Sequence, residues 1–327
     1  MVISLNGLLA PTENPIINPH AEDVESELIK LCNELGIWQP HIGEYNTMSA
    51  YLFPYADKKR LFSIGLFNNL LYFVDDMFDR HKVDQPGNMS LLIPIFHDAA
   101  NTLLNGSAPA ISHPITDAVA EIYTWFKPLV PDSNWLRRFS THTIEHLSSS
   151  LEDVDNDIPG GDAFNQYNSI RDKDSGMSPT IDLIEFALGF TISPTIRQNN
   201  IITHAQLQVA RYCSLTNDLF SYDKEVTKYG SEFNAVVMLQ KDGYSLEEAI
   251  SYLISELNQM VEIFKGIYTK IRSEELSIQM RDKALFYMDC LWYQIIAAYH
   301  WQFSTNRYRS QDSLFFELQS PVFVSSE

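Results

Sequence analysis

The stretch LFSIGLFNNLLYFVDDMFD, from Leu61 to Asp79, is the most informative part of the chain for its fold. From Leu61 to Val74 the residues are apolar almost all the way round a helix, which predicts a helix buried at the centre of a helical protein. Asp75-Asp76-Met77-Phe78-Asp79 follows at once. Carboxylates beside an apolar core are costly unless cations or donors compensate them, although three acids also suit a solvated helix end. A second oxygen cluster decides between these readings.

That second cluster is Asn217-Asp218-Leu219-Phe220-Ser221-Tyr222-Asp223-Lys224-Glu225. Asn217, Ser221 and Glu225 recur at steps of four residues, which lines an amide, a hydroxyl and a carboxylate along one helix face. The apolar residues between them argue against a simple water-facing surface. Hard oxygen ligands of this kind suit Mg²⁺ or Mn²⁺ rather than zinc. Two such faces across a shared cavity would bind Mg²⁺ and, through it, a diphosphate.

The remaining pattern is helical, with little glycine and no alternation typical of strands. Ser245-Leu246-Glu247-Glu248 has the form of a capping box, and Ser175-Gly176 is an expected break between two helices. We expect an all-α, single-domain bundle over 1–327, with about ten or more helices around a central cavity. Residues 1–20 are expected to be irregular, and 309–327 to be a flap or disordered tail. The expected helices are 21–35, 57–80, 89–105, 114–127, 133–151, 163–174, 179–189, 203–229, 246–271 and 276–303.

Composition excludes several partners. The chain has 327 residues, 45% of them hydrophobic, and a formal charge of −19, which disfavours nucleic acid and anionic membranes. No run approaches the roughly 20 apolar residues of a membrane span, and the N-terminus lacks the basic flank of a signal peptide. The three cysteines, Cys32, Cys213 and Cys290, are too few and too scattered for a disulfide framework or zinc site. A reducing, cytoplasmic location fits.

Both acidic motifs resemble those of the class I terpene synthases, the microbial type in particular. That family carries a DDxxD motif, matched at Asp75 to Asp79, and a downstream NDxxSxxxE motif, matched at Asn217 to Glu225. Lys224 stands before the final Glu, as in many bacterial members. The resemblance covers roughly residues 20–310. The chain lacks the class II DxDD motif and the extra N-terminal helical domain of plant members, and Leu70 departs from the aromatic residue that bacterial relatives often carry.

Two further family elements have counterparts. Arg171 matches an arginine that senses diphosphate, with Asp174 as its linker and the Ser175 carbonyl as the effector at the helix break. Arg307-Tyr308 matches a C-terminal Arg-Tyr pair, with Trp301 six residues before the arginine. The resemblance implies that Arg171, Lys224, Arg307 and the Tyr308 hydroxyl neutralise the leaving diphosphate.

The resemblance also implies a metal site and a substrate pocket. About three Mg²⁺ ions are expected, with Mn²⁺ as a substitute. Asp76 is expected to pair with an arginine rather than with metal. Phe67, Leu71 and Tyr72 lie eight, four and three residues before Asp75 on the same helix face, although any one of them is as readily an ordinary core residue. The expected metal ligands are Asp75, Asp79, Asn217, Ser221 and Glu225. The expected pocket residues are Phe67, Leu71, Tyr72, Met177, Ile181 and Trp301.

The implied activity is metal-dependent cyclisation of a prenyl diphosphate, with farnesyl diphosphate giving a sesquiterpene as the first expectation. Geranylgeranyl diphosphate giving a diterpene is the alternative, because pocket depth decides between the two substrates. An isoprenyl diphosphate synthase is less favoured, since it would carry a second Asp-rich motif where this chain has Asn, Ser and Glu. A non-catalytic helical scaffold would have no reason to keep these motifs together. The expected partner is the small-molecule diphosphate, and a homodimer is the one assembly considered.

Overall fold

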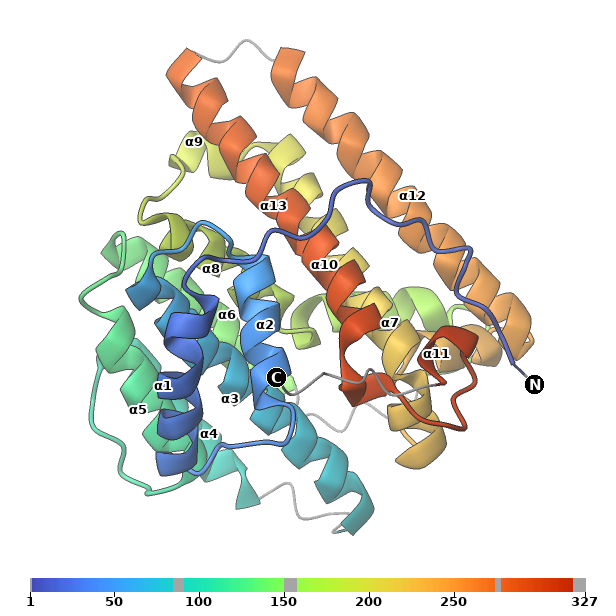
Figure 1. Ribbon diagram of the computed structural model, residues 1–327, viewed down its shortest axis with the longest axis horizontal. Helices are drawn as coiled ribbons and strands as arrows, with labels where there is room; N and C mark the ends of the chain where they lie inside the picture. Colours follow the sequence, from blue (N-terminus) through green and yellow to red (C-terminus); the bar gives the residue numbers. More distant parts are fainter. Residues whose placement is uncertain (1, 85–90, 150–157, 274–277, 320–327) are drawn as a thin grey trace. The chain divides into compact units, whose positions relative to one another are not determined.

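The computed structural model describes residues 2–84, 91–149, 158–273 and 278–319, without the side chains of 79–84 and 278–280 (Figure 1). Thirteen α-helices run through these ranges. The β pairing in them is a single isolated bridge between Ile3 and Phe315. The all-α prediction is therefore confirmed. No helix among the described residues has the length and hydropathy needed to cross a membrane.

The chain forms two compact units, which we name after their central helices. The α3 unit holds Ile16–Asp153 and Lys173–Gln198. The α10 unit holds Met1–Pro15, Val154–Asp172 and Asn199–Glu327. Each unit is described by itself below. The predicted single domain with a central cavity stays a prediction.

The α3 unit is built around the helix that contains the stretch from Leu61. Residues 61–70 are all buried, the polar Ser63, Asn68 and Asn69 among them. Phe67 of α3 meets Phe126, Phe139 and, beyond them, Trp135 and Phe186 in one aromatic core drawn from α3, α5, α6 and α8. The helices of this unit are α1 (Ala21–Glu34), α2 (Ile42–Leu52), α3 (Lys58–Asp84), α4 (Ile93–Asn105), α5 (Pro114–Phe126), α6 (Ser133–Ser149), α8 (Met177–Leu188) and α9 (Pro194–Arg197).

In the α10 unit, α10 packs against both α12 and α13, and Figure 1 shows these three helices running alongside one another. The Ser245 capping box is confirmed, because Ser245 N–H donates to Glu248 and Glu248 N–H donates to the Ser245 hydroxyl. The α-helices of this unit are α7 (Ala163–Asp174, whose last two residues count with the α3 unit), α10 (Asn200–Tyr222), α11 (Ala235–Lys241), α12 (Leu246–Ser273) and α13 (Ile278–Ser304). The other turns are a π-helix (Asp223–Lys228) and two 3₁₀ turns (Asn306–Tyr308 and Phe316–Leu318).

Several boundaries differ from the sequence predictions. The helices α2, α9 and α11 were not predicted. The predicted helix 203–229 begins at Asn200 and gives way to the π-helix after Tyr222. The helix expected to open at Pro179 begins at Met177, because Gly176 at its N-cap adopts a left-handed φ of 68° that ends the break. Residues 309–319 are not a disordered end, because Phe315 and Leu318 are fully buried; the alternative of a flap stays a prediction. Residues 320–327 lie outside the described part of the chain.

Two buried acids on α8 are compensated by cations. Glu185 is 1% exposed and pairs bidentately with Arg197 at 2.6 and 2.7 Å. Asp182 accepts from Arg138 at 2.6 Å, and Arg138 also bonds Glu185. His142 Nδ1 donates to the second Asp182 oxygen at 2.6 Å. Since buried carboxylates need such partners, this network ties α8 to α6 and α9.

The His142–Asp182 pair predicts a pH-dependent stability. The hydrogen bond to Asp182 raises the pKa of His142 above its usual 6.5, and the Asp182 and Glu145 charges add to this. A raised folded-state pKa contributes stability that is complete below the unfolded value and is lost as the pH rises through the folded value. We expect the melting temperature to fall as the pH rises above about 6.5. His142→Gln should remove this part of the slope, and His204→Gln, at an exposed histidine, should leave it; equal slopes in all three proteins would contradict the prediction.

Candidate active site

Helix α10 carries the second acidic motif on a largely buried surface. Asn217 is half-buried, and Ser221, one turn further, is 0% exposed. The Ser221 hydroxyl has no hydrogen-bond partner among the described residues. A buried hydroxyl left unpaired costs about 1–3 kcal/mol. A bound ligand would remove that cost, and a hydroxyl beside an amide oxygen and a carboxylate is a donor set that fits a hard divalent cation.

Asn217 links three elements of the α10 unit. Its Nδ2 donates to the Tyr308 hydroxyl at 2.8 Å, and its Oδ1 accepts from the Arg171 guanidinium at 3.3 Å. The structure thus brings together the predicted metal ligand Asn217, the predicted sensor Arg171 and one member of the C-terminal Arg-Tyr pair. Sequence positions more than forty residues apart meet here through α7, α10 and the turn after α13.

Sequence reasoning missed the anchor of Arg171, which is Asp218. Asp218 is 1% exposed and accepts from Arg171 at 2.8 Å and from the buried Tyr167 hydroxyl at 2.5 Å. Burial raises the pKa of the Asp218 carboxyl, and the Arg171 charge opposes that rise. The available signal was an acid among the apolar residues of a buried helix, which requires a cation nearby.

A second ion pair and a distant cap fix the helix that carries Arg171. Arg211 of α10 grips Asp172 bidentately at 2.8 and 2.9 Å, next to the Arg171–Asp218 pair. At the other end of α7, Asp242 accepts three backbone N–H groups, from Gly161, Ala163 and Phe164. These bonds hold the pKa of Asp242 below its usual range. Helix α7 is therefore held at both ends within this unit.

The π-helix alters the geometry of the last two motif residues. Lys224 and Glu225 are both half-buried within it, and the Tyr229 N–H donates to the Lys224 carbonyl at 3.2 Å, a five-residue closure. In an α-helix each four-residue step drifts about 40° around the axis. A π-turn contains more residues than an α-helical turn, so four residues in it make slightly less than one full rotation about the helix axis. The π-turn therefore offsets the α-helical drift and brings Glu225 closer to the face that carries Ser221. π-turns are frequent at functional sites.

The predicted C-terminal pair lies in the interior of the α10 unit. Arg307 is 8% exposed and Tyr308 is 4% exposed. Trp301 is buried and meets Tyr308 edge-to-face, with ring centroids 6.0 Å apart. Thr305 caps the turn by accepting from the Arg307 N–H. Trp301 is therefore placed beside Tyr308, and its role as a pocket residue stays a prediction.

The first acidic motif belongs to the α3 unit. Asp75 is exposed on α3, and the side chain of Asp79 lies outside the described part of the structure. Tyr72 is half-buried and stacks on the buried Tyr45 of α2, with centroids 3.9 Å apart. Phe67 is packed into the aromatic core described above. Phe67, Leu71 and Tyr72 as pocket residues, and Asp75 and Asp79 as ligands, stay predictions.

The break between α7 and α8 occurs where it was predicted. His146 of α6 donates from Nδ1 to the Asp174 carbonyl at 2.7 Å, and the Met177 N–H donates to the Ser175 hydroxyl at 3.3 Å. A side chain at Gly176 would meet His146 and Leu71, which places Leu71 next to the break. Beyond it, Met177 is half-buried and Ile181 buried on α8. The linker, effector and pocket roles of these residues stay predictions.

No group of three or more His, Cys, Asp or Glu side chains able to hold a metal occurs in the described ranges. The donor set of the α10 unit is instead mixed, with an amide, a hydroxyl and one carboxylate from Asn217, Ser221 and Glu225. Two arginines and a lysine accompany it, from Arg171, Arg307 and Lys224. Oxygen ligands together with guanidinium groups are the residue types that bind divalent metal and phosphate.

The family model "Terpene synthase family 2, C-terminal metal binding" matches residues 66–262, more than half of the chain. The chain therefore belongs to this terpene synthase family.

Curated relatives agree with this assignment. The chain is 26% identical over 243 residues to a (+)-T-muurolol synthase of Roseiflexus castenholzii, covering 72% of this chain and 73% of that one. It is 22% identical over 321 residues to a 10-epi-cubebol synthase of Sorangium cellulosum, covering 94% and 98%. A pentalenene synthase of Streptomyces arenae is 25% identical over 226 residues, covering 67% of this chain but only 64%, just under two thirds, of the relative.

Solved structures share the fold. An α-eudesmol synthase aligns with a TM-score of 0.76 at 18% identity, covering 91% of this chain and 98% of its own. Germacradien-4-ol synthase from Streptomyces citricolor aligns with a TM-score of 0.77 at 17% identity, covering 92% and 99%.

Proposed function

We propose that this protein is a Mg²⁺-dependent terpene cyclase that converts farnesyl diphosphate to a sesquiterpene. The observation that carries the proposal is the unpartnered buried hydroxyl of Ser221, one helix turn from Asn217, which itself bonds Arg171 and Tyr308. Support for the substrate comes from two names. One relative is named as cyclising (2E,6E)-farnesyl diphosphate, and another, from Cyclocybe aegerita, as a sesquiterpene synthase.

The chemistry to be accounted for is loss of diphosphate from an allylic carbon. The carbon–oxygen bond breaks and its electron pair leaves with the diphosphate, so negative charge grows on the leaving group. Arg171 and Arg307 can grip phosphate oxygens through paired N–H donors, and Lys224 supplies a point charge. The Tyr308 hydroxyl, which accepts from Asn217, would donate its proton to the diphosphate. Such preorganised donors stabilise developing charge without reorganisation.

Asn217, Ser221 and Glu225, together with Asp75 and Asp79, are the residues that would hold the metal. When bound, Mg²⁺ neutralises the leaving diphosphate as a Lewis acid. The number of ions, about three, is part of the proposal. The later carbocation loses a proton to give a hydrocarbon, or takes up water and then releases a proton to give an alcohol. Trp301, Tyr72 and Phe67 would offer aromatic faces worth about 0.5–2 kcal/mol each to such a cation.

The test is incubation of the purified protein with farnesyl or geranylgeranyl diphosphate, each with Mg²⁺, with Mn²⁺ and with excess chelator. We expect a cyclic C15 product from farnesyl diphosphate, detected by gas chromatography and mass spectrometry, and no product with chelator. A C20 product alone would replace the substrate by geranylgeranyl diphosphate. Longer prenyl diphosphates, formed with added isopentenyl diphosphate, would make the protein a chain-elongating enzyme. No turnover of any substrate would overturn the proposal.

A further inference from the structure

The segment after Arg307-Tyr308 is firmly attached to the α10 unit. This C-terminal segment, residues 309–319, buries Ser313, Phe315 and Leu318. Arg309 links the two ends of this segment to each other and to α13. Its guanidinium donates to the Glu317 carbonyl at 3.0 Å and to the carbonyl of Phe303, in α13, at 2.5 Å. The segment thus folds back on the end of α13 instead of extending away from it.

One attachment reaches the metal-binding helix. Asp223, the first residue of the π-helix, accepts from the Ser313 hydroxyl at 2.6 Å and from the Leu314 N–H at 2.9 Å, both on the same oxygen. Asp223 lies between Ser221 and Lys224 in sequence, and Ser313 is the fifth residue after Tyr308. The α10 motif and the C-terminal segment are therefore joined twice, at Asn217–Tyr308 and at Asp223–Ser313.

The second attachment comes from the other end of the chain. The Ile3 N–H donates to the Leu314 carbonyl at 2.8 Å, and the Phe316 N–H donates to the Ile3 carbonyl at 3.0 Å. Glu317 accepts from the Ser4 hydroxyl at 2.7 Å and from the Leu5 N–H at 3.1 Å. The N-terminal segment, residues 2–9, is therefore paired with the C-terminal segment through Ile3, Ser4 and Leu5.

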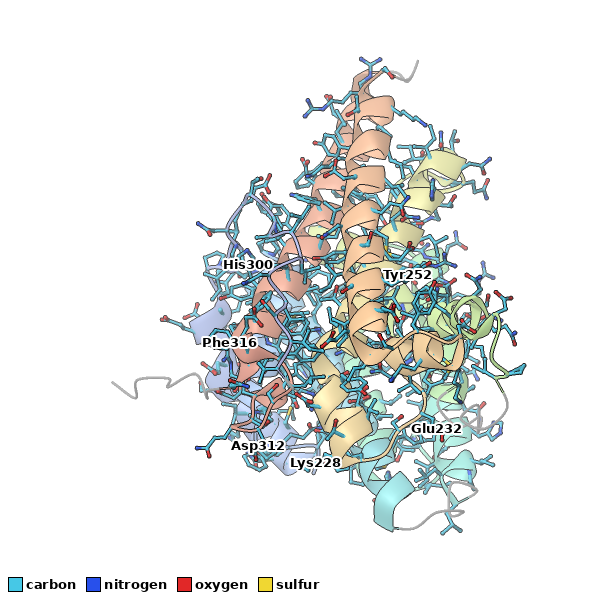
Figure 2. The ribbon with its side chains drawn as sticks, turned by 90° about the vertical axis from the view of Figure 1, so that its right-hand side faces the viewer. Lys228, Glu232, Tyr252, His300, Asp312 and Phe316 are labelled. Atoms are coloured by element: carbon cyan, nitrogen blue, oxygen red, sulfur yellow. The ribbon has the colours of Figure 1, made fainter. Side chains whose placement is uncertain are left out.

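The N-terminal segment is itself fixed to α12. Asn258 accepts from the Leu9 N–H at 2.9 Å and donates to the Gly7 carbonyl at 2.8 Å. Further along the chain, His300 of α13 contacts the Glu13 carbonyl at 3.3 Å. Figure 2 shows this course, with the early chain passing His300 and running beside the C-terminal segment that bears Asp312 and Phe316.

We propose that Asp223 and Glu317 are positioning residues that hold Arg307 and Tyr308 against the metal-binding motif, with the N-terminal segment as the brace. Asp223 fixes the C-terminal segment to the π-helix, and Glu317 fixes it to the N-terminal segment, which is anchored on α12. The physical reason is entropic: ordering a chain end costs conformational entropy at every residue, and these bonds oppose that cost. The effect on catalysis rests on the proposed function, whereas the contacts between the segments do not depend on it.

The first test measures catalysis in Asp223→Ala, Glu317→Ala and Glu317→Gln. We expect kcat to fall about 10- to 100-fold in both alanine variants, because the donors to the diphosphate are misplaced, with a larger share of alcohol among the products. Glu317→Gln keeps an acceptor for the Leu5 N–H and should recover most of the activity. Glu262→Ala, at an exposed acid of α12 paired only locally to Lys265, is the matched control and should behave as wild type.

The second test is hydrogen–deuterium exchange, which does not depend on turnover. Glu317→Ala should speed exchange in residues 2–9 and 309–319 together, while α10 stays protected. Unchanged exchange in these segments would overturn the positioning proposal even if the enzyme were active. If exchange rises in Glu317→Ala but the wild-type protein turns over no substrate, the structural role of the N-terminal segment would stand and the proposed function would be overturned. Raised exchange with wild-type kcat and products would overturn the catalytic role assigned to Asp223 and Glu317.

Discussion

Ser221→Ala should lower turnover about 100-fold while leaving the free energy of unfolding unchanged or slightly higher. Most active-site changes in a buried helix confound function with stability, but this one separates them. The Ser221 hydroxyl is buried and unpartnered within the described chain, so its removal takes away a cost of about 1 kcal/mol rather than a contact. If the hydroxyl is a metal ligand, its loss weakens Mg²⁺ binding, and part of the activity should return at higher Mg²⁺.

The matched control lies on the same helix. Ser214 is also buried, and its hydroxyl donates to the Arg211 carbonyl at 3.2 Å, so Ser214→Ala should cost a little stability and no more than about twofold in turnover. Asn217→Ala and Glu225→Ala should abolish product while the helical circular dichroism is retained. Measurements would be kcat/KM against Mg²⁺ concentration and urea unfolding. Near-normal turnover in Ser221→Ala would remove this residue from the metal site.

Arg171→Met should reduce both stability and turnover, and a second substitution should restore only the first. Arg171 is the cation beside Asp218, which is 1% exposed, so its loss leaves a buried carboxylate with neutral donors, the Tyr167 hydroxyl and the Ala235 backbone N–H. Breaking such a pair lowers the free energy of unfolding by about 3 kcal/mol. The loss is smaller if the buried acid takes up a proton and becomes neutral. In Arg171→Met/Asp218→Asn the buried charge is gone and the amide can still accept from Tyr167.

The double variant should therefore unfold near the wild-type urea concentration and still lack activity, by about 100-fold or more, because the donor to the diphosphate is missing. Asp218→Asn alone should retain more activity than Arg171→Met, since the guanidinium is still present. A double variant that regained turnover along with stability would show that Arg171 acts only on the fold. Arg211→Met, which breaks the neighbouring Asp172 pair at a more exposed position, is the control for a purely structural arginine.

Helices whose apolar residues recur at helical spacing were predictable from the sequence. Helices α2 and α11, which depend on polar side chains, were not. Helix α2 escaped because its buried positions include polar side chains. Asn46 accepts from Asn69 and Ser49 accepts from Asn68, each at 2.8 Å, so α2 packs on α3 partly through hydrogen bonds. A periodicity of apolar residues cannot reveal such a face. Short α11 depends likewise on the side chain of Asn234, which caps it and also bonds the Asp218 carbonyl.

What the sequence determined by itself is local. An unbroken apolar run required α3 to be buried, and the four-residue steps from Asn217 to Ser221 put two oxygens on one face, because helix geometry repeats within a turn. The partners of those residues depended on tertiary structure. Only the packing of α7 on α10 gave Asp218 its cation, and only the pairing of the two chain ends fixed the segment after Tyr308. These contacts join residues far apart in the chain, and no periodic pattern in the sequence marks such pairs. Burial and hydrogen bonding in the folded protein therefore determine which residues meet.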